Sequence, residues 1–232
     1  SIPTTLINES QSVINSIIGA ANYDIGHTFS TGGGGYAQLG CVCTAGSKAR
    51  GVTGTPTPTG DGYDIDFVAH EMGHQFGGEH TFNATTGNCN LTGDNSSNAE
   101  PGSGTTIMAY AGICAANDVQ LHSDPQFHAI SFNQIGTFTR SGNGSTCGTQ
   151  TNTGNSVPVV NAVSNYSIPI NTPFTLTGSA TDANGDALTY SWEQIDVGGA
   201  FSDWNLPTGA APLFRSFAPT TSGSRSFPSM TD

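Results

Sequence analysis

Positive charge is scarce in this sequence. Among its 232 residues only five are Lys or Arg, against 17 Asp or Glu, so the formal net charge is −12. Proteins that bind nucleic acids or dock on anionic membranes present basic surfaces, so the composition excludes both classes. No apolar run approaches the roughly 18 residues of a transmembrane helix, and we expect no membrane insertion.

Charged residues of both signs make up only 9% of the chain, while Gly, Asn, Ser and Thr are abundant. This mixture is typical of β-rich, loop-rich extracellular proteins. The five cysteines all precede residue 150: Cys41, Cys43, Cys89, Cys114 and Cys147. Two disulfides and one odd thiol are the simplest interpretation, which predicts an oxidising compartment and a secreted protein. Five reduced cysteines in a cytosolic protein are the alternative.

The chain divides near residue 155. Residues 1–150 alternate helical and strand patterns, with helices expected at 6–18, 64–76 and 131–140 and strands at 23–30, 36–43 and 48–54. Residues 151–156 form a polar linker without large apolar side chains. We therefore expect an α+β domain over residues 1–150, followed by an all-β module over residues 157–232.

In the second part, strand-like runs alternate with turns, as in a small β-sandwich. Runs at 174–180 and 187–192 flank Asp182, Asn184 and Asp186, a hairpin signal. The oxygen ligands of these three residues could also bind Ca²⁺. A turn stabilised by their side chains is the alternative interpretation.

The clearest helix of the chain carries an apolar stripe. Asp64 is a good N-cap, and Gly77 and Gly78 are typical of a helix end. The stripe follows the spacing i, i+3, i+4, i+7 and i+11, and comprises Ile65, Val68, Ala69, Met72 and Phe76.

The same helix carries the residues of a catalytic metal site. His70 and His74 lie four residues apart and share a face, where both imidazoles can bind one zinc ion. Glu71 lies beside the open coordination position and can accept a proton from water there. Gly77 lets the chain turn back, which brings His80 round as a third ligand. The alternative is that these histidines are merely packed or solvated. That interpretation must also explain why His80 and Gly77 stand at the right positions.

The string from His70 to His80 resembles the extended zinc signature of the metzincin metallopeptidases. Downstream, residues 106–110 are similar to the Met-turn of that superfamily, in which Met108 would form a hydrophobic floor beneath the histidines. Residues 23–27 with 36–43, and the helix at 131–140 followed by Cys147, extend the resemblance over residues 1–150. It is closest to secreted bacterial reprolysin-like enzymes.

The sequence departs from the reprolysin pattern at three points. Thr81 stands where reprolysins usually carry an aspartate. Tyr110 stands two residues after Met108, as in astacins and serralysins, which implies a role in binding zinc or supporting the oxyanion. Its alternative role is a tyrosine of the cleft wall. Only 69 residues precede His70, so we expect the domain to lack its first strands.

The sequence also predicts which cysteines pair and what the second part of the chain resembles. Cys89 and Cys114 bracket the loop between the ligands and the Met-turn, and are expected to pair. The reprolysin resemblance implies that Cys147 pairs with Cys41 or Cys43. Residues 157–232 resemble immunoglobulin-like modules of the cadherin or polycystic-kidney-disease type, with too few strands for a closed sandwich.

Together these features predict a monomeric, secreted zinc endopeptidase. One zinc ion on the three histidines would polarise the scissile carbonyl of a protein or peptide substrate, and Glu71 would act as general base. The substrate would pair with an edge strand that includes Tyr36, Ala37, Gln38 and Leu39. An inactive metzincin-like adhesion protein and a non-peptidase zinc hydrolase are the alternatives.

Overall fold

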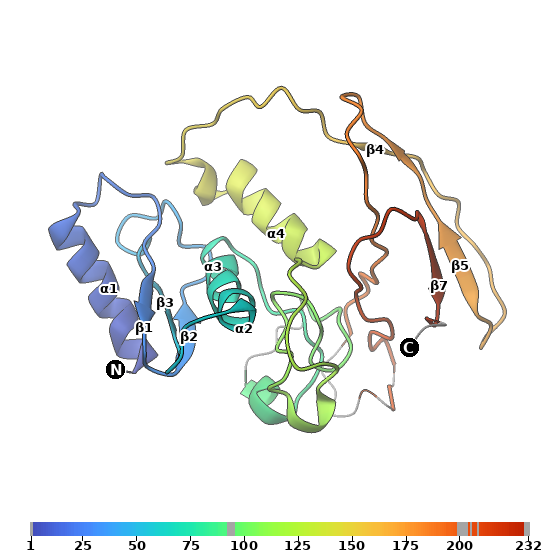
Figure 1. Ribbon diagram of the computed structural model, residues 1–232, viewed down its shortest axis with the longest axis horizontal. Helices are drawn as coiled ribbons and strands as arrows, with labels where there is room; N and C mark the ends of the chain where they lie inside the picture. Colours follow the sequence, from blue (N-terminus) through green and yellow to red (C-terminus); the bar gives the residue numbers. More distant parts are fainter. Residues whose placement is uncertain (1, 92–95, 199–203, 205, 208, 230–232) are drawn as a thin grey trace.

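The computed structural model describes residues 2–91, 96–198, 204, 206–207 and 209–229 (Figure 1). The first part has a mixed α/β architecture, as expected. Its elements are α1 (Pro3–Ile17), β1 (Thr28–Ser30), β2 (Gly34–Ala37), β3 (Gly51–Gly54), α2 (Asp61–Tyr63), η1 (Asp64–Ala69), α3 (His70–Gln75), η2 (Gly87–Leu91), η3 (Ala115–Asn117), α4 (Ala129–Arg140) and η4 (Asn143–Ser145). None of the described helices is both long and apolar enough to cross a membrane.

A three-stranded sheet forms the centre of the first part. Its order is β1-β3-β2, with β1 parallel and β2 antiparallel to β3, so β2 is an edge strand. Every residue of β3 is buried, because α1 and α3 lie on opposite sides of the sheet (Figure 1).

The strands are shorter than the sequence patterns predict. The strand expected at 23–30 forms only at Thr28–Ser30, and the one expected at 36–43 is replaced by Gly34–Ala37. After β2 the backbone turns towards the end of α3. Gly40, with φ +58°, donates to the His74 carbonyl at 2.8 Å, and Cys41 donates to that of Gln75 at 3.0 Å. These bonds replace the strand pairing that the alternating pattern predicts.

The helix that carries His70 and His74 begins earlier than predicted. It starts at Asp61 after Gly60 (φ +83°), instead of at Asp64, and runs through α2, the π-helical segment η1 and α3. Its apolar stripe is only half-buried. As predicted, the helix ends at Gly77, which has φ +90°, and Gly78 donates back to the Gly73 carbonyl at 2.9 Å.

The fully buried side chain of Gln75 fixes the end of α3 against the sheet. Its Nε2 donates to the Gly26 carbonyl at 3.0 Å, and its Oε1 lies 2.7 Å from His27 Nδ1. The other ring nitrogen of His27 lies 2.6 Å from Thr53 Oγ1 on β3. This chain of hydrogen bonds sets the position of the helix that carries His70 and His74.

Both disulfides lie in the first part. Cys89 is bonded to Cys114 and Cys43 to Cys147, while Cys41 is free and completely buried. The structure therefore selects Cys43 as the partner of Cys147. Burial raises the pKa of the Cys41 thiol.

The second part forms two two-stranded sheets. β4 (Val159–Val160) pairs with β6 (Ala180–Thr181), and β5 (Phe174–Thr177) pairs with β7 (Ser224–Phe227), all antiparallel. The predicted hairpin between 174–180 and 187–192 is wrong. Tyr190 makes only an isolated bridge with Thr220. An alternating pattern specifies a strand but not its partner, and β5 finds its partner about 50 residues later.

The turn between these runs is held by a side chain. Asp182 Oδ1 accepts from the backbone N–H of Asn184 at 2.8 Å and of Asp186 at 3.2 Å. This is the turn geometry that the sequence offered as the alternative to a calcium site.

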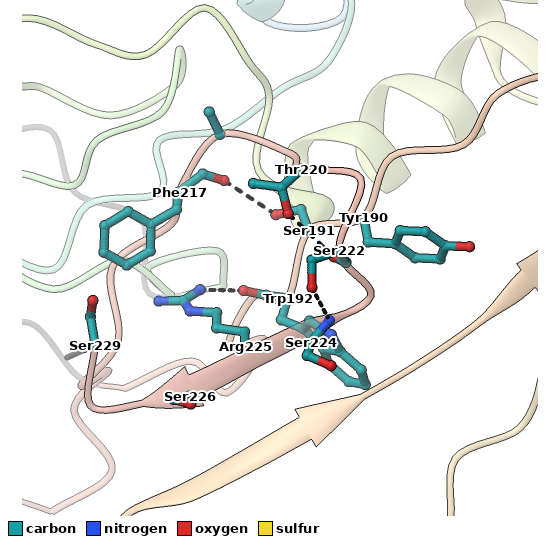
Figure 2. Close-up of a pocket in the computed structure, with 11 residues that line it drawn as sticks. Tyr190, Ser191, Trp192, Phe217, Thr220, Ser222, Ser224, Arg225, Ser226 and Ser229 are labelled. Atoms are coloured by element: carbon teal, nitrogen blue, oxygen red, sulfur yellow. Dashed lines mark hydrogen bonds between the residues drawn. The ribbon is translucent and has the colours of Figure 1, made fainter. Parts of the chain in front are cut away.

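A cavity of about 510 Å³ lies in the second part, between Trp192, Phe217 and Arg225 (Figure 2). The Arg225 guanidinium donates to the Trp192 carbonyl, and its Cζ lies 4.7 Å from the centre of the Phe217 ring. The other lining residues are Tyr190, Ser191, Ala218, Thr220, Ser222, Ser224, Ser226 and Ser229. The lining contains no His, Cys, Asp or Glu.

The second part also packs against the first. Glu193 Oε2 accepts from the Ala129 N–H at the start of α4 at 2.6 Å. Thr105 Oγ1 and Gln126 Nε2 donate to the carbonyls of Ser216 and Phe217, at 3.3 and 3.1 Å. Ser216 and Phe217 therefore contact the loops that precede and follow Met108, and Glu193 contacts the start of α4.

The thiol assignment predicts a labelling pattern. Iodoacetamide should modify no cysteine of the native chain, because Cys41 is completely buried. The unfolded, unreduced chain should take one label, at Cys41, and the reduced chain should take five. Peptide mass spectrometry would read this out, and a label on Cys43 in the unreduced chain would contradict the assignment.

Candidate metal centre and active-site cleft

Three histidines meet at the end of the helix. His70 and His74 project from α3, and the turn at Gly77 returns the chain so that His80 faces both. His80 Nε2 lies 3.2 Å from His70 Nε2 and 3.0 Å from His74 Nε2. Among the described residues, this is the only group of three or more His, Cys, Asp or Glu placed to hold a metal ion.

Two backbone carbonyls orient the histidines on α3. His70 Nδ1 lies 2.7 Å from the Ile107 carbonyl oxygen, and His74 Nδ1 lies 2.6 Å from that of Gly78. A carbonyl only accepts, so both Nδ1 atoms carry the proton and both Nε2 atoms of the neutral rings present lone pairs. Burial and then the neighbouring histidines lower the pKa of His70 well below its usual value, and burial and then His80 lower that of His74 to about 3.

The donor set fits a zinc ion. Two Nε2 lone pairs point at one His80 nitrogen, and a single proton there could satisfy only one of them. A cation among the three nitrogens satisfies all of them, and neutral imidazole is the form that binds metals. Three protein ligands are the number found at catalytic zinc sites.

Glu71 lies directly against the edge strand. A Cβ atom on Gly35 of β2 would come within 2.3 Å of Glu71 Oε1, so only glycine allows this approach. Burial raises the pKa of Glu71 to about 8 in the protein alone, and a cation beside it would act in the opposite direction.

A cleft of about 640 Å³ opens over His70 and Glu71. Its remaining lining is Gly34, Gly35, Asp66, Phe67, Asn88, Ala109, Tyr110, Ala111, Gly112, Ile113, Leu121, His122 and Ser123. The predicted substrate strand is therefore displaced: Tyr36 and Ala37 lie in β2, but Gln38 and Leu39 lie beyond its end. None of these four residues lines the cleft, which is bordered instead by the glycines at the start of β2.

Met108 lies completely buried beneath the helix. A Cβ atom on Gly73 would lie 2.3 Å from Met108 Sδ, so the absence of a side chain there makes room for the methionine. Tyr110 packs against two of these histidines, with its ring centre 4.5 Å from that of His80 and 5.3 Å from that of His70. The structure thus brings both residues to the histidine cluster. Asp182, Asn184 and Asp186 lie in the second part, outside this cluster.

One contact at the cleft escaped the sequence analysis. Asp66 Oδ1 accepts from the Ser123 N–H at 2.7 Å, and its Oδ2 lies 2.6 Å from His122 Nδ1. This pair holds the outer cleft loop against the helix, and Asp66, one turn before His70, was its only sequence signal. A second buried carboxylate, Glu100, faces Thr81. Its position just before the Met-turn is compatible with a supporting role, but only the fold shows that it reaches the residue after His80.

Comparison with known proteins agrees with this geometry. The family model described as "Metallo-peptidase family M12B Reprolysin-like" matches residues 2–137. No curated protein and no solved structure matches significantly.

The contact between Gly73 and Met108 predicts the effect of a small substitution. Gly73→Ala should lower the free energy of unfolding by about 1–3 kcal/mol, because the new Cβ would overlap the methionine sulfur. The matched control is Gly136→Ala on α4, where a Cβ atom has open space. This substitution should raise the free energy of unfolding by up to about 1 kcal/mol, because Ala favours the helix more than Gly does. Urea unfolding of the metal-free chains measures both. Equal effects of the two substitutions would contradict the packing described for Met108.

Proposed function

This chain belongs to the M12B reprolysin-like family of metallopeptidases, and on that premise we propose that it is a secreted, zinc-dependent endopeptidase. One observation carries the proposal: three imidazoles converge at the edge of a 640 Å³ cleft, with Glu71 beside them. A purely structural zinc site is closed, whereas this one adjoins a cleft large enough for a peptide side chain.

Each residue of the site would have a distinct role in hydrolysis. His70, His74 and His80 would hold zinc, which when bound supplies Lewis acidity towards water and the scissile carbonyl. Glu71 would accept the proton of the attacking water and pass it to the leaving amine. Tyr110, against His70 and His80, would donate a hydrogen bond to the developing oxyanion.

The substrate would bind in an extended form along β2. An edge strand offers unpaired N–H and C=O groups, and β2 pairs with β3 on one side only. Gly34 and Gly35 carry no side chains that would hold a peptide backbone away from Glu71. This geometry supports protein or peptide substrates bound through their main chain.

The remaining proposals concern the context of the enzyme. Two disulfides support an oxidising, extracellular location. The resemblance of the sequence to secreted bacterial enzymes supports that subtype, and we propose that the chain acts as a monomer. The strand pairs of residues 157–232 are compatible with an immunoglobulin-like module that binds a partner or acts as a spacer.

Glu71→Gln should separate metal binding from catalysis. The amide cannot accept the proton, so kcat on casein or a fluorogenic peptide library should fall by roughly 10²–10⁴-fold while one zinc per chain is retained. A zinc chelator should abolish the activity of the unsubstituted chain. Glu9→Gln, at an exposed position on α1, is the control and should be fully active.

Other outcomes would change the assignment. Full activity of the Glu71→Gln chain would contradict the general-base role. Zinc bound at one per chain without cleavage of any peptide would favour an inactive binding protein. A chain that binds no zinc would show that the histidine cluster is not a metal site.

Tyr110→Phe tests the oxyanion role. Loss of the hydroxyl should lower kcat by roughly 10²–10³-fold with little change in KM, because the bond forms only in the transition state. Tyr166→Phe, at an exposed position outside the cleft, should have no effect. An unchanged kcat for Tyr110→Phe would leave this residue as part of the cleft wall.

A further inference from the structure

Glu100 is a buried carboxylate that the mechanism above does not use. Its side chain is completely inaccessible to solvent. Its Oε1 accepts from the Thr105 N–H at 2.9 Å, the Thr106 N–H at 3.2 Å and Thr105 Oγ1 at 3.3 Å. Its Oε2 accepts from Thr106 Oγ1 at 2.6 Å and from Thr81 Oγ1 at 2.5 Å. Five donors thus surround one carboxylate.

Thr81 connects this carboxylate to the metal centre, because it directly follows the third ligand, His80. It is completely buried and held on three sides. Its N–H donates to the Met108 carbonyl at 3.1 Å, its carbonyl accepts from the Glu100 N–H at 2.9 Å, and its hydroxyl donates to Glu100 Oε2. The backbone at His80 therefore has little freedom to shift relative to Met108.

The same carboxylate also reaches the segment that orients His70. Thr105 and Thr106 directly precede Ile107, whose carbonyl lies 2.7 Å from His70 Nδ1. Glu100 thus links the chain after His80 to the chain that fixes His70. His80 lies outside any helix or strand, so nothing in regular secondary structure sets its distance from the two ligands on α3.

We infer that Glu100 is a positioning residue of the metal centre, which sets His80 through Thr81 and the Met108 segment through Thr105 and Thr106. This inference rests on the proposed function, since it assumes that the three histidines bind zinc. Burying a carboxylate is costly unless every oxygen is hydrogen-bonded, and apolar residues would fill the space at lower cost. The five donors to Glu100 lie on the segment that follows His80 and on the segment that orients His70. A carboxylate at this place is explained if it holds these two segments together.

The test measures zinc affinity by competition with a chromophoric chelator, together with the absorption spectrum of the cobalt-substituted chain. Thr81→Val and Glu100→Ala should each weaken zinc binding by roughly 10–100-fold, the range found when partners behind metal ligands are removed. The cobalt bands should shift as well. The double substitution should weaken zinc binding little more than either single substitution does, because both remove the same hydrogen bond between Thr81 and Glu100.

Conservative substitutions should restore binding. Thr81→Ser keeps the hydroxyl. Glu100→Gln keeps an oxygen for the two backbone N–H groups and an amide that can donate to the hydroxyls. Both should bind zinc with an affinity close to that of the unsubstituted chain. Glu193→Ala is the control, since it removes another hydrogen-bonded carboxylate that contacts α4 but not the ligand segments. It should lower thermal stability and leave zinc affinity unchanged.

The inference is overturned if folded Thr81→Val and Glu100→Ala chains bind zinc as tightly as the unsubstituted chain. If Glu100→Ala does not fold, Thr81→Val and Thr81→Ser still test the inference. Equal zinc affinity of these two chains would overturn it. An unsubstituted chain that binds zinc but cleaves no peptide would overturn the proposed peptidase while the affinity series still decides the role of Glu100. An unsubstituted chain that binds no zinc would overturn both.

Discussion

Two hydrogen bonds to backbone carbonyls determine what the histidine cluster can do. The carbonyls of Gly78 and Ile107 keep the proton on Nδ1 of His74 and His70, which turns both Nε2 lone pairs towards His80. Without them the rings could rotate or change tautomer, and the contacts of 3.2 and 3.0 Å between His80 Nε2 and the other two rings would be ordinary hydrogen bonds. One carbonyl belongs to the turn that ends the helix, and the other to the segment before Met108. The metal centre therefore depends on how these two segments are held.

The rest of the first part holds them in place. Gln75 fixes the helix end to the sheet through Gly26 and His27. Glycines at positions 35 and 73 allow the edge strand and Met108 to approach the helix more closely than any side chain would permit. The Cys89–Cys114 disulfide closes the loop between the ligands and the cleft wall. Together these contacts provide the rigid support that a catalytic site requires.

The second part contributes to this support as well. Ser216 and Phe217 accept hydrogen bonds from the loops on either side of Met108. Glu193 joins the two parts at a different place, away from the histidine segments, where it accepts from the first N–H of α4. An acceptor at a helix N-terminus both satisfies an unpaired N–H and places negative charge where the helix dipole favours it. The polar linker at 151–156 thus joins two parts that share contacts, and Ser216 and Phe217 lie against the loops around Met108.

The sequence by itself determined the features that depend on local spacing. A four-residue interval puts His70 and His74 on one helix face, Gly77 ends that helix, and the family resemblance identified Met108 and Tyr110. Only the tertiary structure decided which thiol pairs with Cys147, where β2 ends, which strands pair after residue 157, and that Glu100 faces Thr81. Helical periodicity is fixed by the backbone and can be read from the sequence, whereas contacts between distant segments depend on how the whole chain packs.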